Sequence, residues 1–119
     1  MRASPYLLSA ALFAAGTGLA LAADQDFTLV NHTGKQIDSV YVSKVSTKSW
    51  EEDVMGKDTL DAGESVDISF ARGERGCRWD LMVKYHSGGQ DVWSNVNLCD
   101  VSQVTLYCDQ SGEVQAHSE

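Results

Sequence analysis

The fold is decided by residues 77–99, which read CRWDLMVKYHSGGQDVWSNVNLC. Two runs rich in β-branched and aromatic residues flank Gly88 and Gly89, and a Gly-Gly pair suits a two-residue turn with positive φ. The stretch therefore predicts a β-hairpin with one mostly apolar face. In this register the pairs on that face are Tyr85 with Val92, Val83 with Ser94, Leu81 with Val96, and Trp79 with Leu98.

The opposite face of the predicted hairpin is mostly polar, and it carries Trp93. An aromatic side chain exposed among polar neighbours is a candidate contact residue for a protein partner. The alternative is that a second sheet, or the loop that carries Trp50, covers this face. Trp93 and Trp50 are therefore the two candidate contact residues.

Cysteines stand at both ends of the hairpin and do not fit this register. Cys77 would pair with Asp100, and Cys99 would point to the opposite face. A three-residue loop would set Cys77 opposite Cys99 but would mismatch every apolar pair. Several buried apolar side chains at about 1.5–3 kcal/mol each outweigh one ideal bond geometry. The burial pattern is therefore preferred, and a bond between the two cysteines would need a bulge or an irregular strand end near Cys99.

The rest of the chain alternates mainly with period two, which predicts strands at residues 27–30, 37–43, 65–70 and 101–107. Between the first two, Asn31 is expected to bond nearby backbone in a turn where Gly34 takes positive φ. Ser49 and Glu52 match a capping box, which predicts one or two helical turns over residues 50–55. From residue 109 the polar tail is expected to fray. The fold predicted is a small antiparallel β-sandwich of about six or seven strands with one short helical turn in a connection.

The first 22 residues have the features of a secretory signal peptide. Arg2 is followed by an uncharged run rich in alanine and leucine that closes on Ala20-Leu21-Ala22. Gly16 and Gly18 interrupt the run, whereas a membrane-spanning helix needs about 20 predominantly apolar residues. We therefore expect removal of residues 1–22, a single domain over residues 23–119 without membrane insertion, and a periplasmic or secreted location.

Charge and cysteine content narrow the classes of partner. The chain without residues 1–22 retains eight of the nine basic residues and all 17 acidic ones, a formal charge of −9. Such a charge repels phosphate backbones, so nucleic acid is not expected as a partner, and a soluble monomer is expected. Cys77, Cys99 and Cys108 are disulfide material in an oxidising compartment, although an odd number leaves one over. No C-x-x-C pair is present to indicate zinc.

Several short motifs occur in the order typical of one family. They are Asn31-x-Thr33-Gly34, Val40-Tyr41-Val42-Ser43, Trp50-x-x-Asp53-x-Met55-Gly56, Leu60-x-x-Gly63-Glu64-Ser65, Cys77-x-x-Asp80-Leu81 and Val96-Asn97-Leu98-Cys99. Over residues 26–107 the chain resembles a family of small exported bacterial proteins of proteobacterial type, whose members are mostly uncharacterised. The resemblance implies a compact β-sandwich-like domain with Cys77 bonded to Cys99. It implies no counterpart for Cys108 and no reaction.

No catalytic set of residues is evident, so a non-enzymatic binding module that meets a protein partner is the leading prediction. The partner would meet its sheet face or its acidic loop. A calcium-stabilised domain is the alternative, because Asp53, Asp58 and Asp61 lie in a loop dense in carboxylates. That loop lacks the spacing of an EF-hand, and charge runs are usually solvated surface. An enzyme is the third prediction, since His32, His86 and His117 are not tied by spacing to any nucleophile. No cofactor is expected.

Overall fold

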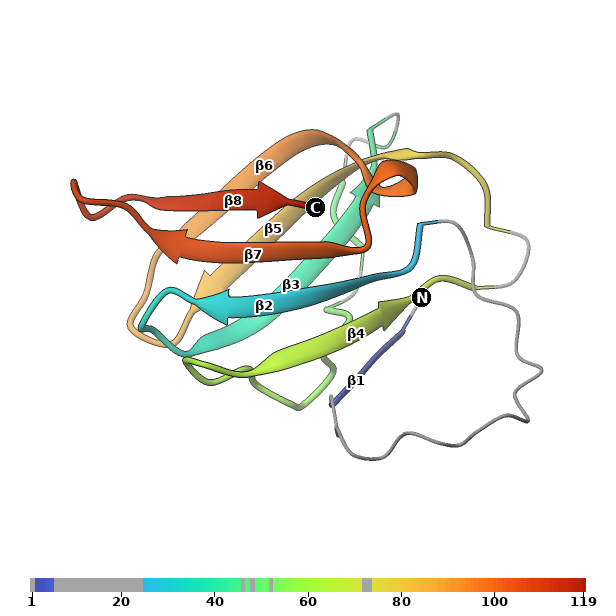
Figure 1. Cartoon of the computed structure of the whole chain (residues 1–119). Helices are drawn as coiled ribbons and strands as arrows, with labels where there is room; N and C mark the ends of the chain where they lie inside the picture. Colours follow the sequence, from blue (N-terminus) through green and yellow to red (C-terminus); the bar gives the residue numbers. More distant parts are fainter. Residues whose placement is uncertain (1, 6–24, 46, 48, 52, 72–73) are drawn as a thin grey trace, which may run out of the picture.

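The computed structural model describes residues 2–5, 25–45, 47, 49–51, 53–71 and 74–119, and these form two packed β-sheets (Figure 1). One sheet has the strand order β1-β4-β2-β7-β8 and the other the order β3-β5-β6. The all-β sandwich is therefore confirmed, with the seven strands β2–β8 in the predicted domain. The bounds are β1 Arg2–Pro5, β2 Phe27–His32, β3 Ile37–Lys44, β4 Ser65–Ser69, β5 Arg78–Tyr85, β6 Gln90–Asn97, the 3-10 helix η2 Leu98–Asp100, β7 Gln103–Cys108 and β8 Val114–Ser118.

Strand β1 belongs to the predicted signal peptide. It runs antiparallel to β4, with Arg2 beside Ser69 and Pro5 beside Val66. Most of the predicted signal, residues 6–24, lies outside the described residues. Removal of residues 1–22 stays a prediction, and it would leave sheet order β4-β2-β7-β8.

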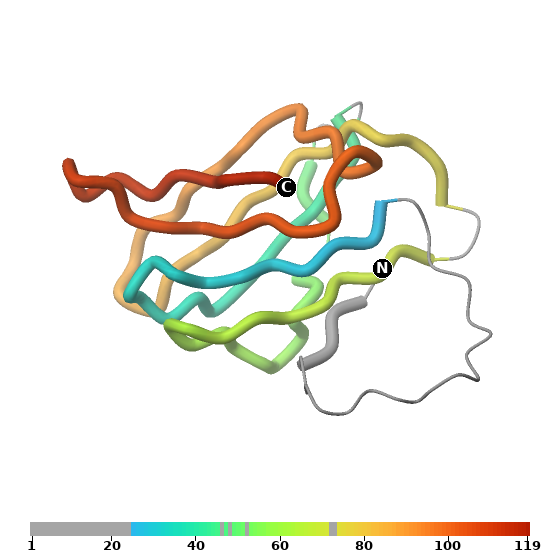
Figure 2. The backbone as a smooth tube through the Cα atoms, in the orientation of Figure 1, coloured from blue at the N-terminus to red at the C-terminus, as the bar shows by residue number. Residues whose placement is uncertain are grey.

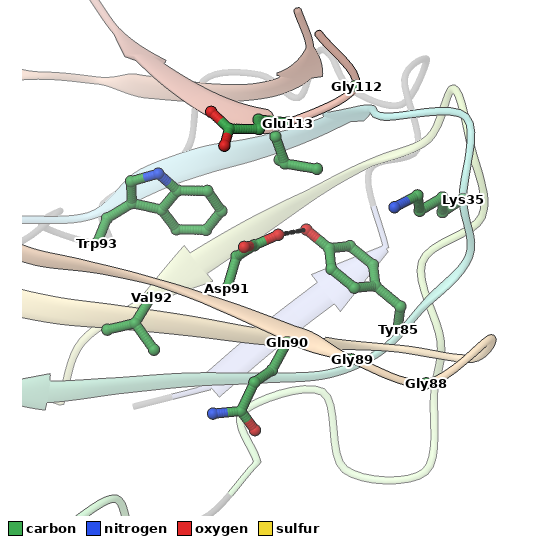
Figure 3. A pocket seen from close by; sticks show the side chains of 11 residues that line it. Lys35, Tyr85, Gly88, Gly89, Gln90, Asp91, Val92, Trp93, Gly112 and Glu113 are labelled. Atoms are coloured by element: carbon green, nitrogen blue, oxygen red, sulfur yellow. Dashed lines mark hydrogen bonds between the residues drawn. The ribbon is translucent and has the colours of Figure 1, made fainter.

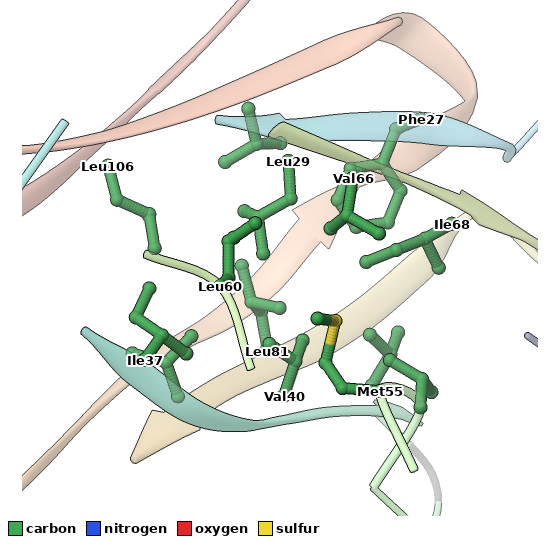
Figure 4. Close-up of a cluster of buried hydrophobic side chains, with 14 of the residues drawn as sticks. Phe27, Leu29, Ile37, Val40, Met55, Leu60, Val66, Ile68, Leu81 and Leu106 are labelled. Atoms are coloured by element: carbon green, nitrogen blue, oxygen red, sulfur yellow. The ribbon is translucent and has the colours of Figure 1, made fainter. Parts of the chain in front are cut away.

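The core lies between the two sheets. Leu29 of β2 and Leu106 of β7 face Val40 of β3 and Leu81 of β5, and all four are buried (Figure 4). The connection between β3 and β4 adds Leu60 to this core. Within the larger sheet β2 and β7 are parallel, whereas the other strand pairs are antiparallel. Period-two alternation explains the core, because each strand turns alternate side chains inward.

The predicted register of the β5–β6 hairpin is wrong. Leu81 pairs with Trp93 rather than Val96, and Met82 pairs with Val92. The amide of Tyr85 bonds the carbonyl of Gly89, which leaves a three-residue loop where two residues were predicted. The changed pairing places Trp93 opposite Leu81 on the core face and Val92 opposite Met82 on the outer face.

A β-bulge restores the apolar pattern beyond Trp93. The register shifts by one residue opposite Asp80, where Asn95 takes φ 59° and donates its backbone N–H to Asp80 Oδ1. Trp79 then pairs with Val96. One extra residue in a strand reverses which of the side chains beyond it face the core. The prediction missed the three-residue loop, whereas it allowed for a bulge or an irregular strand end near Cys99.

The disulfide between Cys77 and Cys99 is present, with the two Cα atoms 5.1 Å apart. The expected irregular strand end is η2, which begins at Leu98 directly after β6. Asn97 caps it by accepting the Cys99 N–H, and the Leu98 N–H donates to the Cys77 carbonyl. The helical turn of the fold is thus in the β6–β7 connection.

The helical turn predicted over residues 50–55 is not found at that place. Trp50, Glu51 and Asp53 have no regular secondary structure, Glu52 lies outside the described residues, and residues 54–57 form hydrogen-bonded turns. Asp53 explains the difference, because its Oδ1 accepts the N–H groups of Val40 and Met55. This carboxylate ties the connection to the edge of β3 instead of starting a helix.

The tail is not frayed from residue 109, contrary to the prediction. Residues 114–118 form β8, which pairs antiparallel with β7 (Figure 2). Val114 and Ala116 alternate with the more polar Gln115 and His117, and Val114 is buried in the core. Five residues with this alternation are enough for an edge strand when a neighbouring strand is already in place.

Asp109 organises the turn between β7 and β8. Its Oδ1 accepts the backbone N–H groups of Ser111 and Glu113 and the Ser111 hydroxyl, and its Oδ2 accepts from Gln115. These hydrogen bonds, that of the Ser111 hydroxyl first, lower the pKa of Asp109 to about 2.

We expect the Asp109 carboxyl to titrate near pH 2 in an NMR titration, rather than near its ordinary value of 3.8. A carboxyl with a lowered folded pKa stabilises the fold above its unfolded pKa, and this contribution is lost as the pH falls from about 4 to about 2. Asp109→Asn should flatten that part of the acid unfolding curve. A midpoint near 3.8 would contradict the contacts described for the turn.

Candidate functional site

An open groove runs along the side of the sandwich where the edge strands β6 and β8 lie next to each other. Two adjoining cavities of about 500 and about 530 Å³ make up this groove, and they share Val92 and Trp93. We call it the β6–β8 groove. One end is lined by Lys35, Tyr85, Gly88, Gly89, Gln90, Asp91, Gly112, Glu113 and Val114, and the other by Ser94, Asn95, Val96, Asn97, Asp100, Val101, Ala116 and Ser118.

Trp93 occupies the middle of the groove. Its ring is half-buried and packs against the hydrophobic core, and so do Val96 and Ala116 on the two sides of the groove. The predicted exposure of Trp93 on a polar face is wrong, because the three-residue hairpin loop turns it inward. Its contact with a partner stays a prediction, and Trp93 lines both cavities.

The end nearest the hairpin loop is polar and ordered. The Tyr85 hydroxyl donates to Asp91 Oδ2 over 2.7 Å, and the Lys35 ammonium lies 5.0 Å from the centre of the Tyr85 ring (Figure 3). Burial raises the pKa of the Tyr85 phenol, and its hydrogen bond to Asp91 raises that pKa further. The phenol therefore remains a donor at neutral pH and fixes the Asp91 carboxylate. Figure 3 shows Trp93, Asp91 and Glu113 around the same opening.

The charges that line the groove are mostly negative. Three carboxylates line it, those of Asp91 and Glu113 at one end and that of Asp100 at the other. The ammonium of Lys35, at the same end as Asp91, is the positive charge among the lining residues. Lys35 is held over Tyr85, whereas Glu113 is exposed. An apolar middle flanked by carboxylates is complementary to a ligand with apolar and cationic side chains.

Trp50, the other candidate contact residue, is not brought together with Trp93. Its ring lies 6.5 Å from that of Tyr41, with an angle of 58° between the planes. Tyr41 pairs with Met82, which pairs with Val92, so this row lies on the outer face of the smaller sheet. Trp93 points to the inner face. The two tryptophans therefore belong to different surfaces.

The candidate calcium ligands Asp53, Asp58 and Asp61 do not form a site. Asp53 is engaged by two backbone amides, and Asp58 and Asp61 lie farther along the connection. Among the residues that the structure describes, no group of three or more His, Cys, Asp or Glu side chains is arranged to hold a metal ion. No helix within the described ranges is long and apolar enough to cross a membrane.

The histidines and the third cysteine lie outside the groove. His86 Nδ1 lies 3.1 Å from Asp38 Oδ2 in a solvent-exposed pair, and His117 lies 3.7 Å from Glu119. Cys108 is exposed, and its thiol lies 3.2 Å from the Thr33 carbonyl oxygen.

Comparison with known proteins supports the fold. No protein-family model matches the chain, and no curated protein matches it either. The fold is similar to the NMR structure of a protein from Eubacterium rectale, with a TM-score of 0.55 and 17% identity over 78% of this chain and 85% of that one. At this identity the likeness shows a shared β fold alone, and the resemblance to the exported family stays a prediction.

Sequence reasoning missed Glu113, Ala116 and the other β8 residues of the groove. The alternation of Val114 and Ala116 with polar residues was the local signal for a strand there. Nothing in the sequence places β8 beside β6, because the two strands meet only through the packing of the two sheets.

Proposed function

We propose that the protein is an exported, non-enzymatic binding module, and that a segment of a protein partner binds in the β6–β8 groove around Trp93. The observation that carries the proposal is this groove, in which a half-buried tryptophan stands between two strand edges and between two groups of carboxylates. Tryptophan often supplies much of the binding free energy of an interface. Its large ring buries a wide apolar area, and its side chain loses little conformational entropy on binding.

The disulfide and the charge agree with this proposal. A bond between Cys77 and Cys99 is consistent with an oxidising location outside the cytoplasm. The acidic composition favours a basic partner and speeds the encounter with one. A second candidate surface is the outer row of Tyr41, Met82 and Val92, but Met82 is buried there and only Val92 lines a described cavity, which is the groove itself.

A bead library of hexapeptides with blocked ends tests the proposal. Wild-type protein is expected to select peptides that bind it at micromolar to submillimolar concentration. Trp93→Leu should weaken these peptides at least tenfold, because leucine keeps an apolar contact with the core but lacks the ring surface. Trp50→Leu is the matched control and should change affinity less than twofold.

Melting temperatures of both variants separate a loss of binding from a loss of folding. Selection of no peptide by the folded wild-type protein would contradict the proposed function. Peptides that respond to Trp50→Leu and not to Trp93→Leu would move the site to the outer face of the smaller sheet.

A further inference from the structure

Among the described residues, the free edge of β8 is regular and borders the groove. The edge of β3 is bonded by its own chain, since the Ile37 N–H donates to Leu60 O, the Leu60 N–H to Ile37 O and the Val54 N–H to Val40 O. The edge of β6 carries the bulge at Asn95, and such bulges discourage pairing with another strand. At the far side of the larger sheet β1 pairs with β4, and removal of residues 1–22 would open the edge of β4, but no residue of β1 or β4 lines the groove.

The backbone of β8 is directed so that it offers hydrogen bonds to a further strand. The Glu119 N–H donates to Gln103 O and the Gln103 N–H to Glu119 O, and the Asp109 N–H donates to Glu113 O. In an antiparallel pair, bonded positions alternate with non-bonded ones. Residues 115 and 117 therefore bond β7, and the N–H and C=O groups of Val114, Ala116 and Ser118 point to the free edge.

The side chains of the same three residues line the groove. Val114 lines the polar end, and Ala116 and Ser118 line the apolar end beside Trp93. A strand added to β8 would therefore place every second side chain in the groove. The alternate side chains would lie beside Gln115 and His117 on the other face, together with the carboxylate of Glu119, whereas Glu113 precedes β8 and lines the polar end of the groove.

We propose that the free edge of β8 is a strand acceptor, and that the segment it binds is extended and alternates apolar with cationic side chains. The apolar side chains contact Trp93 and Ala116, and the cationic ones lie near Glu113 and Glu119. Main-chain hydrogen bonds supply affinity and the alternate side chains supply specificity in this mode of recognition. The inference rests on the proposed function, because it names the occupant of the same groove.

A blocked hexapeptide in which lysine and valine alternate is the probe. On its addition, hydrogen exchange at the amides of Val114, Ala116 and Ser118 should slow at least tenfold in saturated protein. The amides of Gln115 and His117 are the internal control, since they already bond β7 and should change little. Slowing at Ser65, Asp67 and Ser69, whose amides face away from β2, would instead place the peptide on the edge of β4 and overturn the proposal.

Two substitutions test the backbone and the charge separately. Ala116→Pro removes one N–H from the free edge without removing a bond to β7, and should weaken the peptide at least tenfold, whereas Ala116→Ser keeps the N–H and should change affinity less than twofold. Glu113→Lys should weaken it about fivefold or more at low salt, and Glu51→Lys, with the same change in net charge outside the groove, less than twofold.

The outcomes also separate the inference from the proposed function. Library peptides that depend on Trp93 but tolerate Ala116→Pro with unchanged affinity would overturn strand addition and leave the binding module standing. If the lysine-valine peptide fails to bind while acidic peptides bind the groove, the proposal that the bound segment carries cationic side chains is overturned. The melting temperature of the Ala116→Pro protein shows whether this variant is folded when its peptide affinity is compared with that of the wild type.

Discussion

Replacing both Cys77 and Cys99 by serine is expected to lower the free energy of unfolding by about 3 kcal/mol. The bond closes a loop across a sequence separation of 22 residues, and the chain-entropy model gives about this value for such a loop. For a domain of this size the melting temperature should fall by more than about 10 °C. Calorimetry of the oxidised protein and the double variant measures the difference.

Cys108→Ser is the matched control for the disulfide. This thiol is exposed and meets the Thr33 carbonyl oxygen, so its replacement should change stability by less than about 0.5 kcal/mol. A double variant that melts within about 3 °C of the oxidised protein would contradict the expected contribution of the bond. Peptide binding should weaken as well, because η2 positions Asp100 and Val101 at the apolar end of the groove.

The sequence was a good guide to the strands and to the core. Strands predicted from alternation at residues 27–30, 37–43 and 65–70 agree with β2, β3 and β4 within two residues at each end. Apolar alternation is a local property, and it reports directly which side chains face the core. For the same reason Val66 and Ile68 are buried as their alternation indicates.

Pairing between strands was predicted less well, because it depends on turns and bulges that leave weak local signals. Gly88 and Gly89 fit a two-residue turn, yet the chain closes a three-residue loop and corrects the mismatch with a bulge at Asn95. The cysteine spacing did not favour this loop either, because the three-residue loop that sets Cys77 opposite Cys99 pairs His86 with Gln90, whereas the observed loop pairs Tyr85 with Gly89. The expected irregular end near Cys99 was correct, and the predicted two-residue turn was the error.

The groove could not be predicted from the sequence. It exists because β6 and β8, which end different sheets, come to the same side of the sandwich. Trp93 was identified as a contact residue for a reason that the structure does not support, its exposure on a polar face. Glu113 and Ala116 were not considered, since the tail was expected to fray and the alternation of Val114 and Ala116 was not read as a strand.

Asn31 is a buried polar residue whose replacement should have the second large effect. Its side chain is inaccessible to solvent, and its Nδ2 donates to the carbonyls of Lys35 and Leu60. Its Oδ1 accepts the N–H and the hydroxyl of Thr33. The predicted role of Asn31 in a turn with Gly34, which has φ 81°, is confirmed. The bond to Leu60 extends this role, because it ties the turn to the connection that covers β3.

Asn31→Ala is expected to lower the free energy of unfolding by about 1–3 kcal/mol. It leaves the buried N–H of Thr33 without its partner, and such a group costs about that much, whereas the carbonyls of Leu60 and Lys35 keep the Ile37 N–H and the Thr33 hydroxyl. Asn31→Asp should cost at least as much at neutral pH, because it replaces two donors by an acceptor that faces two carbonyl oxygens. Burial would raise the pKa of that carboxyl, so its cost should grow as the pH rises above the ordinary range of aspartate.

Urea unfolding at pH 4 and pH 7 measures both variants of Asn31, with Gln36→Ala as the control. Gln36 makes a local bond to Asp38, and its loss should cost less than about 1 kcal/mol. Among the described residues every buried side-chain nitrogen or oxygen has a hydrogen-bond partner, so no other buried side chain is free to replace the lost amide of Asn31. An Asn31→Ala protein as stable as Gln36→Ala would show that water replaces the lost amide, and that the turn does not depend on this side chain.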